Sequence, residues 1–228
     1  HSHLHLLKDH LQPQEFTFVI TKSDIQESVP TFYFNSHFEH SSDDPIMIAH
    51  SSGTTGIPKA VLLQHSAFFY GVRYRLNLPR IPGGETILSS LPHSHNCAIA
   101  YIMLAMLSGT PVYITSNHEG ASVLKRIEEF KPKMVVSFPQ TYVEMTEANL
   151  NEFDLSSVNL WFNGGDAAHE SHIRALIQQG SHQKDGQIVR GSIFIDGMGS
   201  SEMGFSLFRN VHTQETNNYN RCVGRPLE

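Results

Sequence analysis

The stretch Ser51-Ser52-Gly53-Thr54-Thr55-Gly56-Ile57-Pro58-Lys59 follows a short apolar run at residues 45–49, with one residue, His50, between them. Its two glycines permit a tight turn and let the backbone approach a polyanion without interference from Cβ atoms. Four hydroxyl groups and exposed N–H groups can donate hydrogen bonds to phosphate oxygens, and Lys59 adds a positive charge. Pro58 stiffens the end of the loop and lowers the entropy lost when the loop closes on a ligand. The stretch therefore predicts a phosphate-binding loop at the end of a strand.

Two alternatives for this loop are weaker. A Ser/Thr/Gly turn without a ligand is the default for an isolated glycine-rich loop, and the motifs further along the chain decide against it. A Walker-type loop needs Gly, Lys and Ser or Thr in direct succession, whereas Lys59 follows Pro58 and precedes Ala60. We therefore expect a phosphate-binding loop of a different class.

Short apolar runs bounded by Gly, Pro or Ser alternate with stretches of helical length on both sides of the loop. This order is typical of parallel βαβ units and predicts an α/β fold of layered, mostly parallel sheets flanked by helices. Chemistry in such sheets collects where strands end and loops begin. The expected strands are residues 16–21, 45–49, 86–89, 111–114, 134–138, 160–162 and 192–195. The expected helices are 66–76, 96–107, 120–130, 141–148 and 170–178, and the polar segments 34–44, 180–186 and 212–221 are expected to be loops.

Composition narrows the choice of partner. The 228 residues carry 16 basic and 22 acidic side chains, without a Lys/Arg cluster, which argues against nucleic acid or anionic lipid and favours a small molecule. Cys97 and Cys222 are too few for a disulfide framework and lack metal-ligand spacing, so we expect a reducing, cytoplasmic setting. The longest apolar run, residues 97–107, is about half of the roughly 20 residues that cross a bilayer, so no membrane span is expected.

The loop resembles the phosphate-binding signature of the adenylate-forming superfamily, which contains acyl- and aryl-CoA synthetases, peptide-synthetase adenylation domains and luciferases. The usual form is Thr/Ser-Ser-Gly-Thr-Thr-Gly-x-Pro-Lys-Gly, and Ala60 replaces the last glycine here. Val61 and Leu62 continue the family pattern into the next helix. The resemblance implies nucleotide contacts from Ser51, Ser52, Gly53, Thr54, Thr55, Gly56 and Lys59, with Thr54, Thr55 and Lys59 acting in catalysis.

Two further segments resemble the acid-binding parts of the superfamily. Leu91-Pro92-His93-Ser94-His95-Asn96 resembles the segment that lines the acyl pocket, which implies that His95 acts there, with Asn96 as a second substrate contact. Without that context, His95 would be read as a helix cap or packing residue. Asn163-Gly164-Gly165-Asp166-Ala167 resembles the turn that packs along adenine and substrate, which implies contacts from Gly164, Gly165 and Asp166. A plain strand-to-helix turn is the alternative for it.

Met198-Gly199-Ser200-Ser201-Glu202-Met203-Gly204 resembles the family segment Tyr-Gly-x-Thr-Glu. The resemblance implies that Ser201 donates to the α-phosphate and that Glu202, together with Thr55, holds Mg²⁺. Met198 takes the place of an aromatic residue on adenine. Gly199 and Ser200 complete the nucleotide contacts, and Gly199 also borders the substrate. Val223-Gly224-Arg225-Pro226 resembles the turn that opens the next β unit.

The function implied is that of an acid-thiol ligase: ATP activates a carboxylic acid to an acyl-adenylate, and a thiol of coenzyme A or a carrier-protein phosphopantetheine takes the acyl group. Amino-acid-activating relatives place an Asp where Asn96 stands, and a neutral amide cannot offset a buried ammonium group. The expected substrate is therefore a carboxylic acid that is not an amino acid. Two alternatives stay open, a domain dedicated to a hydroxyaryl acid and a carrier protein, and a noncatalytic nucleotide-binding remnant.

The resemblance also bears on domain organisation. Members of the superfamily carry a ribose-binding Asp, a hinge and a small C-terminal domain with a catalytic Lys after the Val-Gly-x-Pro turn, and this chain stops at Glu228. We expect residues 1–228 to be the central part of the large N-terminal domain, without the small C-terminal domain. Such a fragment is expected to bind nucleotide but to catalyse poorly.

Overall fold

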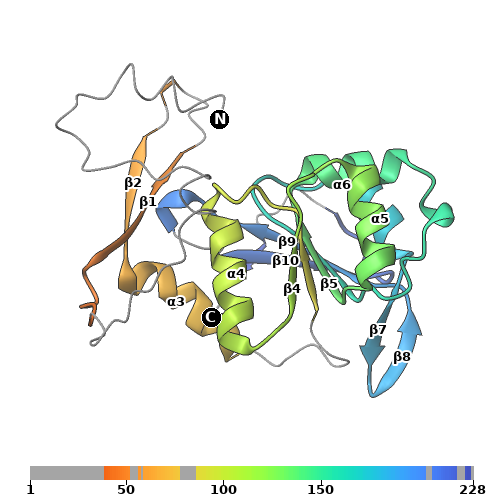
Figure 1. Ribbon diagram of the computed structural model, residues 1–228. Coiled ribbons are helices and arrows are strands. Elements are labelled where there is room, and N and C mark those ends of the chain that lie inside the picture. Colours follow the sequence, from red (N-terminus) through yellow and green to blue (C-terminus); the bar gives the residue numbers. More distant parts are fainter. Residues whose placement is uncertain are drawn as a thin grey trace, which may run out of the picture. The chain divides into compact units, whose positions relative to one another are not determined.

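The computed structural model describes residues 39–51, 56–57, 59–77, 86–203, 207–219 and 224–226 (Figure 1). The chain divides into two compact units, residues 1–39 and 40–228, and the following account concerns the second. The strand expected at residues 16–21 lies outside the described residues. Among the described helices, none combines the length and apolar character needed to span a membrane.

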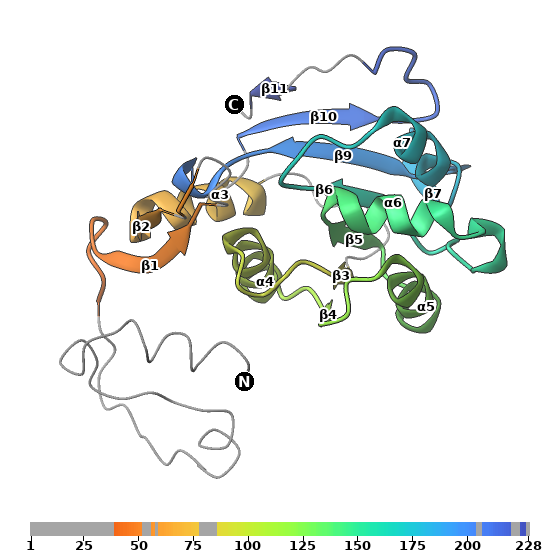
Figure 2. The ribbon, with the colours of Figure 1, turned by 90° about the horizontal axis from the view of Figure 1, so that it is seen from above.

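A sheet of seven strands forms the centre of the described part of the second unit, in the order β11-β10-β9-β6-β5-β3-β4 (Figure 2). The strands from β9 to β4 run parallel, and β10 and β11 extend one edge, each antiparallel to the strand before it in this order. The predicted mixed α/β fold with a mostly parallel sheet is therefore confirmed. The strands are β3 Ile87–Ser89, β4 Val112–Ile114, β5 Met134–Ser137, β6 Leu160–Asn163, β9 Ile193–Met198, β10 Phe208–His212 and β11 Arg225–Pro226.

The helices connect these strands and cover both faces of the sheet, with α4 on one side and α5 and α6 on the other (Figure 1). Each lies within two residues of its predicted bounds. A proline, Pro139, begins α6, and Gly109 ends α4 in the left-handed conformation at φ 67°. The helices are α3 His65–Leu76, α4 Asn96–Ser108, α5 Gly120–Phe130, α6 Pro139–Glu147 and α7 Glu170–Ile177.

Two hydrophobic cores lie on opposite faces of the sheet because successive strand residues point in opposite directions. In β6, Trp161 packs with α5, α6 and α7, whereas Phe162 packs with α3 and α4. The indole of Trp161 is fully buried, and its Nε1 donates to Ser192 Oγ at 2.7 Å and to the Leu176 carbonyl oxygen at 3.1 Å. The same alternation places Val135 and Val136 of β5 in different cores. The sheet is thus buried on both sides, as the apolar runs predict.

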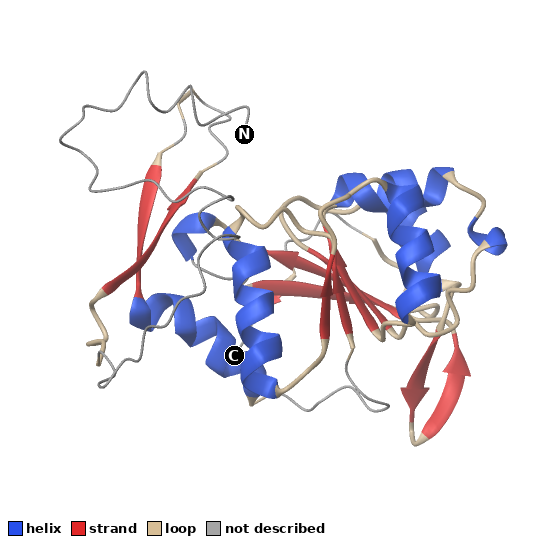
Figure 3. Cartoon of the chain, viewed as in Figure 1, coloured by secondary structure: helices blue, strands red, loops and turns tan. Residues whose placement is uncertain are grey.

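Five described strands, β2, β7, β8, β10 and β11, were not among the strands expected from the sequence (Figure 3). The segment after the loop forms β2 Ala60–Gln64, so the expectation that it leads straight into a helix is wrong. It pairs antiparallel with β1 Pro45–His50 in a separate two-stranded sheet. Where residues 180–186 were expected to be a loop, β7 Ser181–Lys184 and β8 Gln187–Arg190 form a hairpin. Asp185 and Gly186 turn it with φ values of 50° and 79°.

Candidate active site

The two ends of the predicted phosphate-binding loop, Ser51 and Lys59, are held together as in a hairpin. Ser51 N–H donates to the Lys59 carbonyl oxygen at 3.0 Å, and Lys59 N–H donates to Ser51 Oγ at 3.0 Å. These bonds continue the β1–β2 ladder by one residue pair, so residues 51 and 59 hold the two ends of the loop together. Gly56 adopts φ 143°, a value that side chains disfavour. Ser52, Gly53, Thr54, Thr55 and Pro58 lie outside the described residues.

Ser201 and Glu202 lie at the base of this loop, in the short 3-10 helix Ser201–Met203 that follows β9. Ser201 Oγ donates to the carbonyl oxygen of His50, the last residue of β1, at 3.0 Å. The pKa of Glu202 is lowered by hydrogen bonds from its own backbone N–H and from the Ser200 hydroxyl, and further by the positive charge of Lys59. The fold therefore brings together an ionised carboxylate, a hydroxyl group and a lysine from two distant parts of the sequence.

His95 begins α4, where its Nδ1 accepts a hydrogen bond from Cys97 N–H at 3.2 Å. The helix-cap role is therefore present, and the ring also packs edge-on against Phe138 with 4.9 Å between centroids. Burial lowers the pKa of His95, and the nearby His50 lowers it further, so the ring is neutral at pH 7. Asn96 beside it is 5% exposed. The end of β1 and the start of α4 thus face the same region.

The turn after β6 reaches that region from the other side. A Cβ atom on Gly164 would lie 3.5 Å from the sulfur of Cys97, and one on Gly165 would lie 3.2 Å from the ring of Phe138. Gly165 also has φ 94°, so a side chain at this position would be strained as well as crowded. Phe138 therefore contacts both His95 and the Gly164–Gly165 turn.

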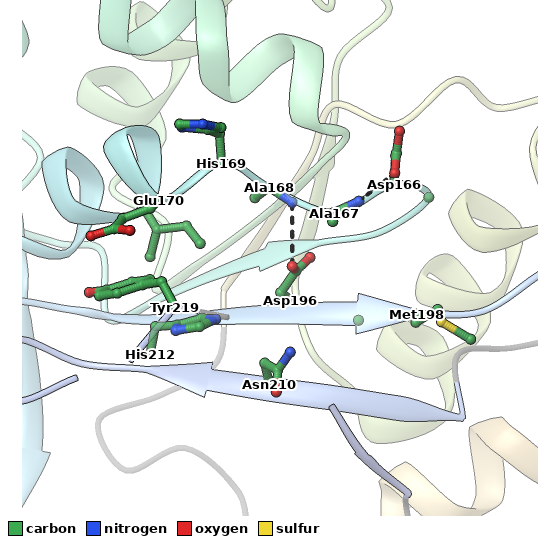
Figure 4. Close-up of a pocket in the computed structure, with 13 residues that line it drawn as sticks. Asp166, Ala167, Ala168, His169, Glu170, Asp196, Met198, Asn210, His212 and Tyr219 are labelled. Atoms are coloured by element: carbon green, nitrogen blue, oxygen red, sulfur yellow. Dashed lines mark hydrogen bonds between the residues drawn. The ribbon is translucent and has the colours of Figure 1, made fainter. Parts of the chain in front are cut away.

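A cavity of about 720 Å³ opens beside the turn (Figure 4). Residues 165–170 form one wall, and β9 and β10 form the other. Gly165, Asp166 and Met198 were predicted to contact nucleotide and line this cavity. The Asp166 carboxylate is exposed and accepts from Ala167 N–H at 2.7 Å. Six polar residues of the lining were missed by the sequence analysis: His169, Glu170, Asp196, Asn210, His212 and Tyr219.

Asp196 is the acidic group at the centre of the cavity wall. Its carboxylate accepts from Asn163 Nδ2 at 2.6 Å and from Ala168 N–H at 3.3 Å, the latter drawn in Figure 4. Burial raises the pKa of Asp196, although these two bonds favour the ionised form. Asp196 pairs with Asn210 across the β9–β10 ladder, so both side chains lie on the cavity face. The sequence alone does not show which residues of the two strands pair.

His212 and Tyr219 close the far end of the cavity. Their rings stack with 5.0 Å between centroids and an interplanar angle of 4°. His212 is 7% exposed, and its Nδ1, like the Tyr219 hydroxyl, is buried without a hydrogen-bond partner in the described part of the chain. Burial lowers the pKa of His212. The cavity therefore offers polar atoms whose hydrogen bonds a ligand could complete.

Comparison with known proteins decides the family. The profile of the family described as AMP-binding enzyme matches residues 4–228. The chain belongs to this family. Among curated relatives, this AMP-binding chain is 44% identical over 205 residues to 3-aminoavenalumate diazotase from Streptomyces sp. The aligned region covers 88% of the chain and 36% of that protein. It is 29% identical over 151 residues to 4-coumarate–CoA ligase CCL1 from Humulus lupulus, and that aligned region covers 64% of the chain and 28% of that protein.

The AMP-binding chain thus spans about a third of the length of these curated relatives. A solved structure with the same fold is the N-terminal subdomain of NpsA from Klebsiella oxytoca in complex with anthranilyl-AMSN. The two match with a TM-score of 0.67 at 20% identity, over 90% of this chain and 50% of the other. The predicted identity as part of an adenylate-forming N-terminal domain is confirmed at the level of family and fold.

The site of this AMP-binding chain suits a magnesium ion that arrives with a nucleotide. Mg²⁺ prefers oxygen ligands and is usually held by one or two carboxylates together with substrate phosphates and water. Glu202 supplies an exposed, ionised carboxylate beside Lys59. In the described part of the chain, no group of three His, Cys, Asp or Glu side chains could hold a metal by itself. The donor set therefore fits a metal shared with phosphates.

Proposed function

We propose that this chain carries the ATP site and the acid site of an enzyme that joins an organic acid to AMP. The hydrogen bond from Ser201 to the His50 carbonyl carries the proposal, because it fixes Ser201 and Glu202 at the base of the glycine-rich loop. In adenylation a carboxylate oxygen attacks the α-phosphorus of ATP, and pyrophosphate leaves. Both nucleophile and leaving group are anionic, so positioned positive charge and hydrogen-bond donors lower the barrier.

Each part of the site has a role in this reaction. The loop from Ser51 to Lys59 binds the β- and γ-phosphates, with Thr54 and Thr55 donating hydrogen bonds, and the Ser201 hydroxyl donates to the α-phosphate. Glu202 and Thr55 hold Mg²⁺, which neutralises charge on the phosphate oxygens when bound. Adenine lies in the cavity, where its exocyclic amine donates to Asp196. The nucleotide contacts are completed by Gly164, Gly165, Asp166, Met198, Gly199 and Ser200.

The acid lies on the His95 side, against Asn96, Gly164 and Gly199. Asn96 is buried and neutral, which favours an acid without an α-ammonium group. The named relatives act on 4-coumarate or 3-aminoavenalumate, or bind anthranilyl-AMSN, so we propose an aryl or arylpropenoic acid. The acyl-adenylate then passes its acyl group to a thiol of coenzyme A or a carrier protein, with AMP as leaving group. We place this reaction in the cytoplasm.

The similarity to a diazotase supports a second candidate, because that relative matches more of the chain at higher identity than the ligase does. Nitrite resembles a carboxylate in sharing one negative charge between two oxygens. An oxygen of nitrite attacks the α-phosphorus of ATP, and pyrophosphate leaves. The nitrogen of an arylamine then bonds to the nitrosyl nitrogen, and AMP departs with the electron pair. Loss of water from the protonated nitrosamine gives the diazonium group.

Calorimetric titration of ATP into the chain, with and without Mg²⁺, tests the shared nucleotide site. Glu202→Gln should weaken binding of ATP with Mg²⁺ roughly tenfold, about 1.4 kcal/mol, and leave metal-free binding unchanged. The matched control is Glu147→Gln, an exposed carboxylate on α6. A chain that binds no ATP, or a Glu202→Gln variant with unchanged Mg²⁺ dependence, contradicts the proposal.

Mass spectrometry of reaction products separates the two candidates. ATP and an arylpropenoic acid should yield the acyl-adenylate under the first, and coenzyme A should convert it to the thioester. Under the second, ATP yields AMP and pyrophosphate only when nitrite is present, and an aminoaryl acid is converted to its diazonium product. The assay is run on this chain and on the longest protein that contains it.

A further inference from the structure

The cavity beside the Gly164–Gly165 turn is longer than the base that we place in it. Met198 lies at one end, Asp196 near the middle, and the His212–Tyr219 stack at the other end (Figure 4). Met198 and Phe194 are four residues apart in β9, which corresponds to about 13 Å at roughly 3.3 Å per residue, and Phe194 pairs with His212. A purine ring that contacts Met198 and donates to Asp196 covers only about half of this length.

The inner half of the cavity is the part between Asp196 and the His212–Tyr219 stack. The ring of Tyr219 is held between two groups, the ring of His212 with 5.0 Å between centroids and Arg174, whose Cζ lies 4.3 Å from the Tyr219 centroid. Arg174 in turn donates from Nε to the Glu170 carboxylate at 2.7 Å. Contacts on both faces of the Tyr219 ring fix it in place, so the end wall of the inner half is formed before any ligand arrives.

The chemistry of the inner half favours an uncharged, flat group. The end wall presents the edge of the Tyr219 ring, because both faces of that ring are covered, and ring edges contact the face of another aromatic ring favourably. His212 Nδ1 and the Tyr219 hydroxyl add polar atoms that are buried without a partner in the described part of the chain. The described residues that line the cavity include no Lys or Arg, but they include three acids: Asp166, Glu170 and Asp196. A phosphate or carboxylate is therefore disfavoured.

We propose that the inner half of the cavity binds a flat, uncharged substituent on the exocyclic nitrogen of adenine. The exocyclic amine has two hydrogens, and only one is needed for the hydrogen bond to Asp196. A substituent that replaces the other hydrogen leaves this bond intact and extends beyond Asp196 toward the His212–Tyr219 stack. The ligand class is then an N⁶-substituted adenine nucleotide. This inference rests on the proposed function, which places the adenine amine at Asp196.

Ala168 lies where the inner half begins. Its N–H donates to Asp196 at 3.3 Å, and its methyl group packs on the core cluster that contains Ile173 and Phe194. Phe194 is the cross-strand neighbour of His212, and Ile173 also lines the cavity. A longer side chain at position 168 would therefore reduce the space between Asp196 and the end wall.

Calorimetric titration of three nucleotides with Mg²⁺ into the chain tests the inference. The wild type should bind N⁶-benzyl-ATP at least as tightly as ATP. It should bind N⁶,N⁶-dimethyl-ATP at least tenfold more weakly, because that nucleotide has no N–H for Asp196. Ala168→Leu should weaken binding of N⁶-benzyl-ATP at least tenfold and change ATP binding less than twofold. The matched control is Ala148→Leu, which should change neither affinity: both alanines are partly buried and pack on the same core, but Ala148 does not line the cavity.

Several outcomes would overturn the inference. A wild type that binds ATP but binds N⁶-benzyl-ATP tenfold more weakly has no such subsite, and this measurement does not depend on any variant folding. An Ala168→Leu variant that still binds N⁶-benzyl-ATP as the wild type does places the substituent outside the inner half. Should Ala168→Leu fail to fold, Ala168→Val, which adds two methyl groups, must show a smaller loss of the same sign. A folded wild type that binds none of the three nucleotides refutes the proposed function itself, a result distinct from loss of N⁶-benzyl-ATP binding alone.

Discussion

Asp196 is a carboxyl group that the fold buries beside Asn163 and leaves facing the cavity. Burial raises its pKa above the value of 3.8 expected in the unfolded chain. Between these two pKa values the native state binds more protons than the unfolded state, so stability falls as the pH rises through that window. At neutral pH the burial of the ionised carboxylate therefore still lowers the free energy of unfolding. A group kept at such a cost in a cavity is a candidate for ligand binding.

Asp196→Asn should therefore abolish the part of the pH dependence that this carboxyl group causes. The variant should gain stability relative to the wild type as the pH rises above about 4, and keep that gain at pH 7. Its ATP affinity should fall, because an amide is the weaker acceptor for the adenine amine. Urea unfolding at a series of pH values measures the first effect, and calorimetry the second. For the unfolding measurement, Asp166→Asn, an exposed acid of the same wall, is the control; an identical pH profile in both variants would contradict the argument.

The residues of the site differ in how far the sequence reveals them. Ser201 and Glu202 belong to a motif that can be recognised in the sequence, and so do Gly164 and Gly165. Asp196 and His212 reach the cavity only because β9 and β10 pair in one particular register. Period-two alternation shows that residues share a face but not which partner strand lies beside them.

At the scale of elements, the helices and parallel strands follow from apolar spacing and cap residues, and the two hairpins do not. The run Ala60–Gln64 has no alternation, and a short apolar run fits a strand or a helix equally well. The polar hairpin β7–β8 lacks a hydrophobic face altogether. Its Asp185-Gly186 pair was nevertheless a readable signal, since that dipeptide favours the turn of a two-residue hairpin.

The glycine just before this hairpin, Gly180, supplies a prediction about stability. A Cβ atom on Gly180 would lie 1.9 Å from the carbonyl oxygen of Val158, and Gly180 also has φ 72°. Gly180→Ala should lower the free energy of unfolding by at least about 3 kcal/mol, because backbone atoms on both sides must move. Gly186 has a similar φ of 79° but open space around it, so Gly186→Ala should cost only about 1 kcal/mol. Chemical denaturation compares the two, and equal losses would show that φ alone decides.

For the whole molecule, ATP should act as a stabilising ligand. A ligand that binds only the native state at 100 times its Kd adds about 2.7 kcal/mol to the free energy of unfolding. ATP with Mg²⁺ should therefore raise the Tm in a concentration-dependent way. GTP should raise it much less, because the guanine O6 is an acceptor and cannot donate to Asp196. Differential scanning calorimetry with both nucleotides tests this, and equal shifts would contradict the placement of the base in the cavity.

Phe138 belongs to neither proposed subsite alone, since its ring touches His95 on one side and the Gly164–Gly165 turn on the other. A smaller side chain at position 138 would weaken the packing beside both the acid site and the adenine site. The affinities for the acid and for ATP should therefore change together. Selection for a new acid through this position would incur a penalty in ATP use.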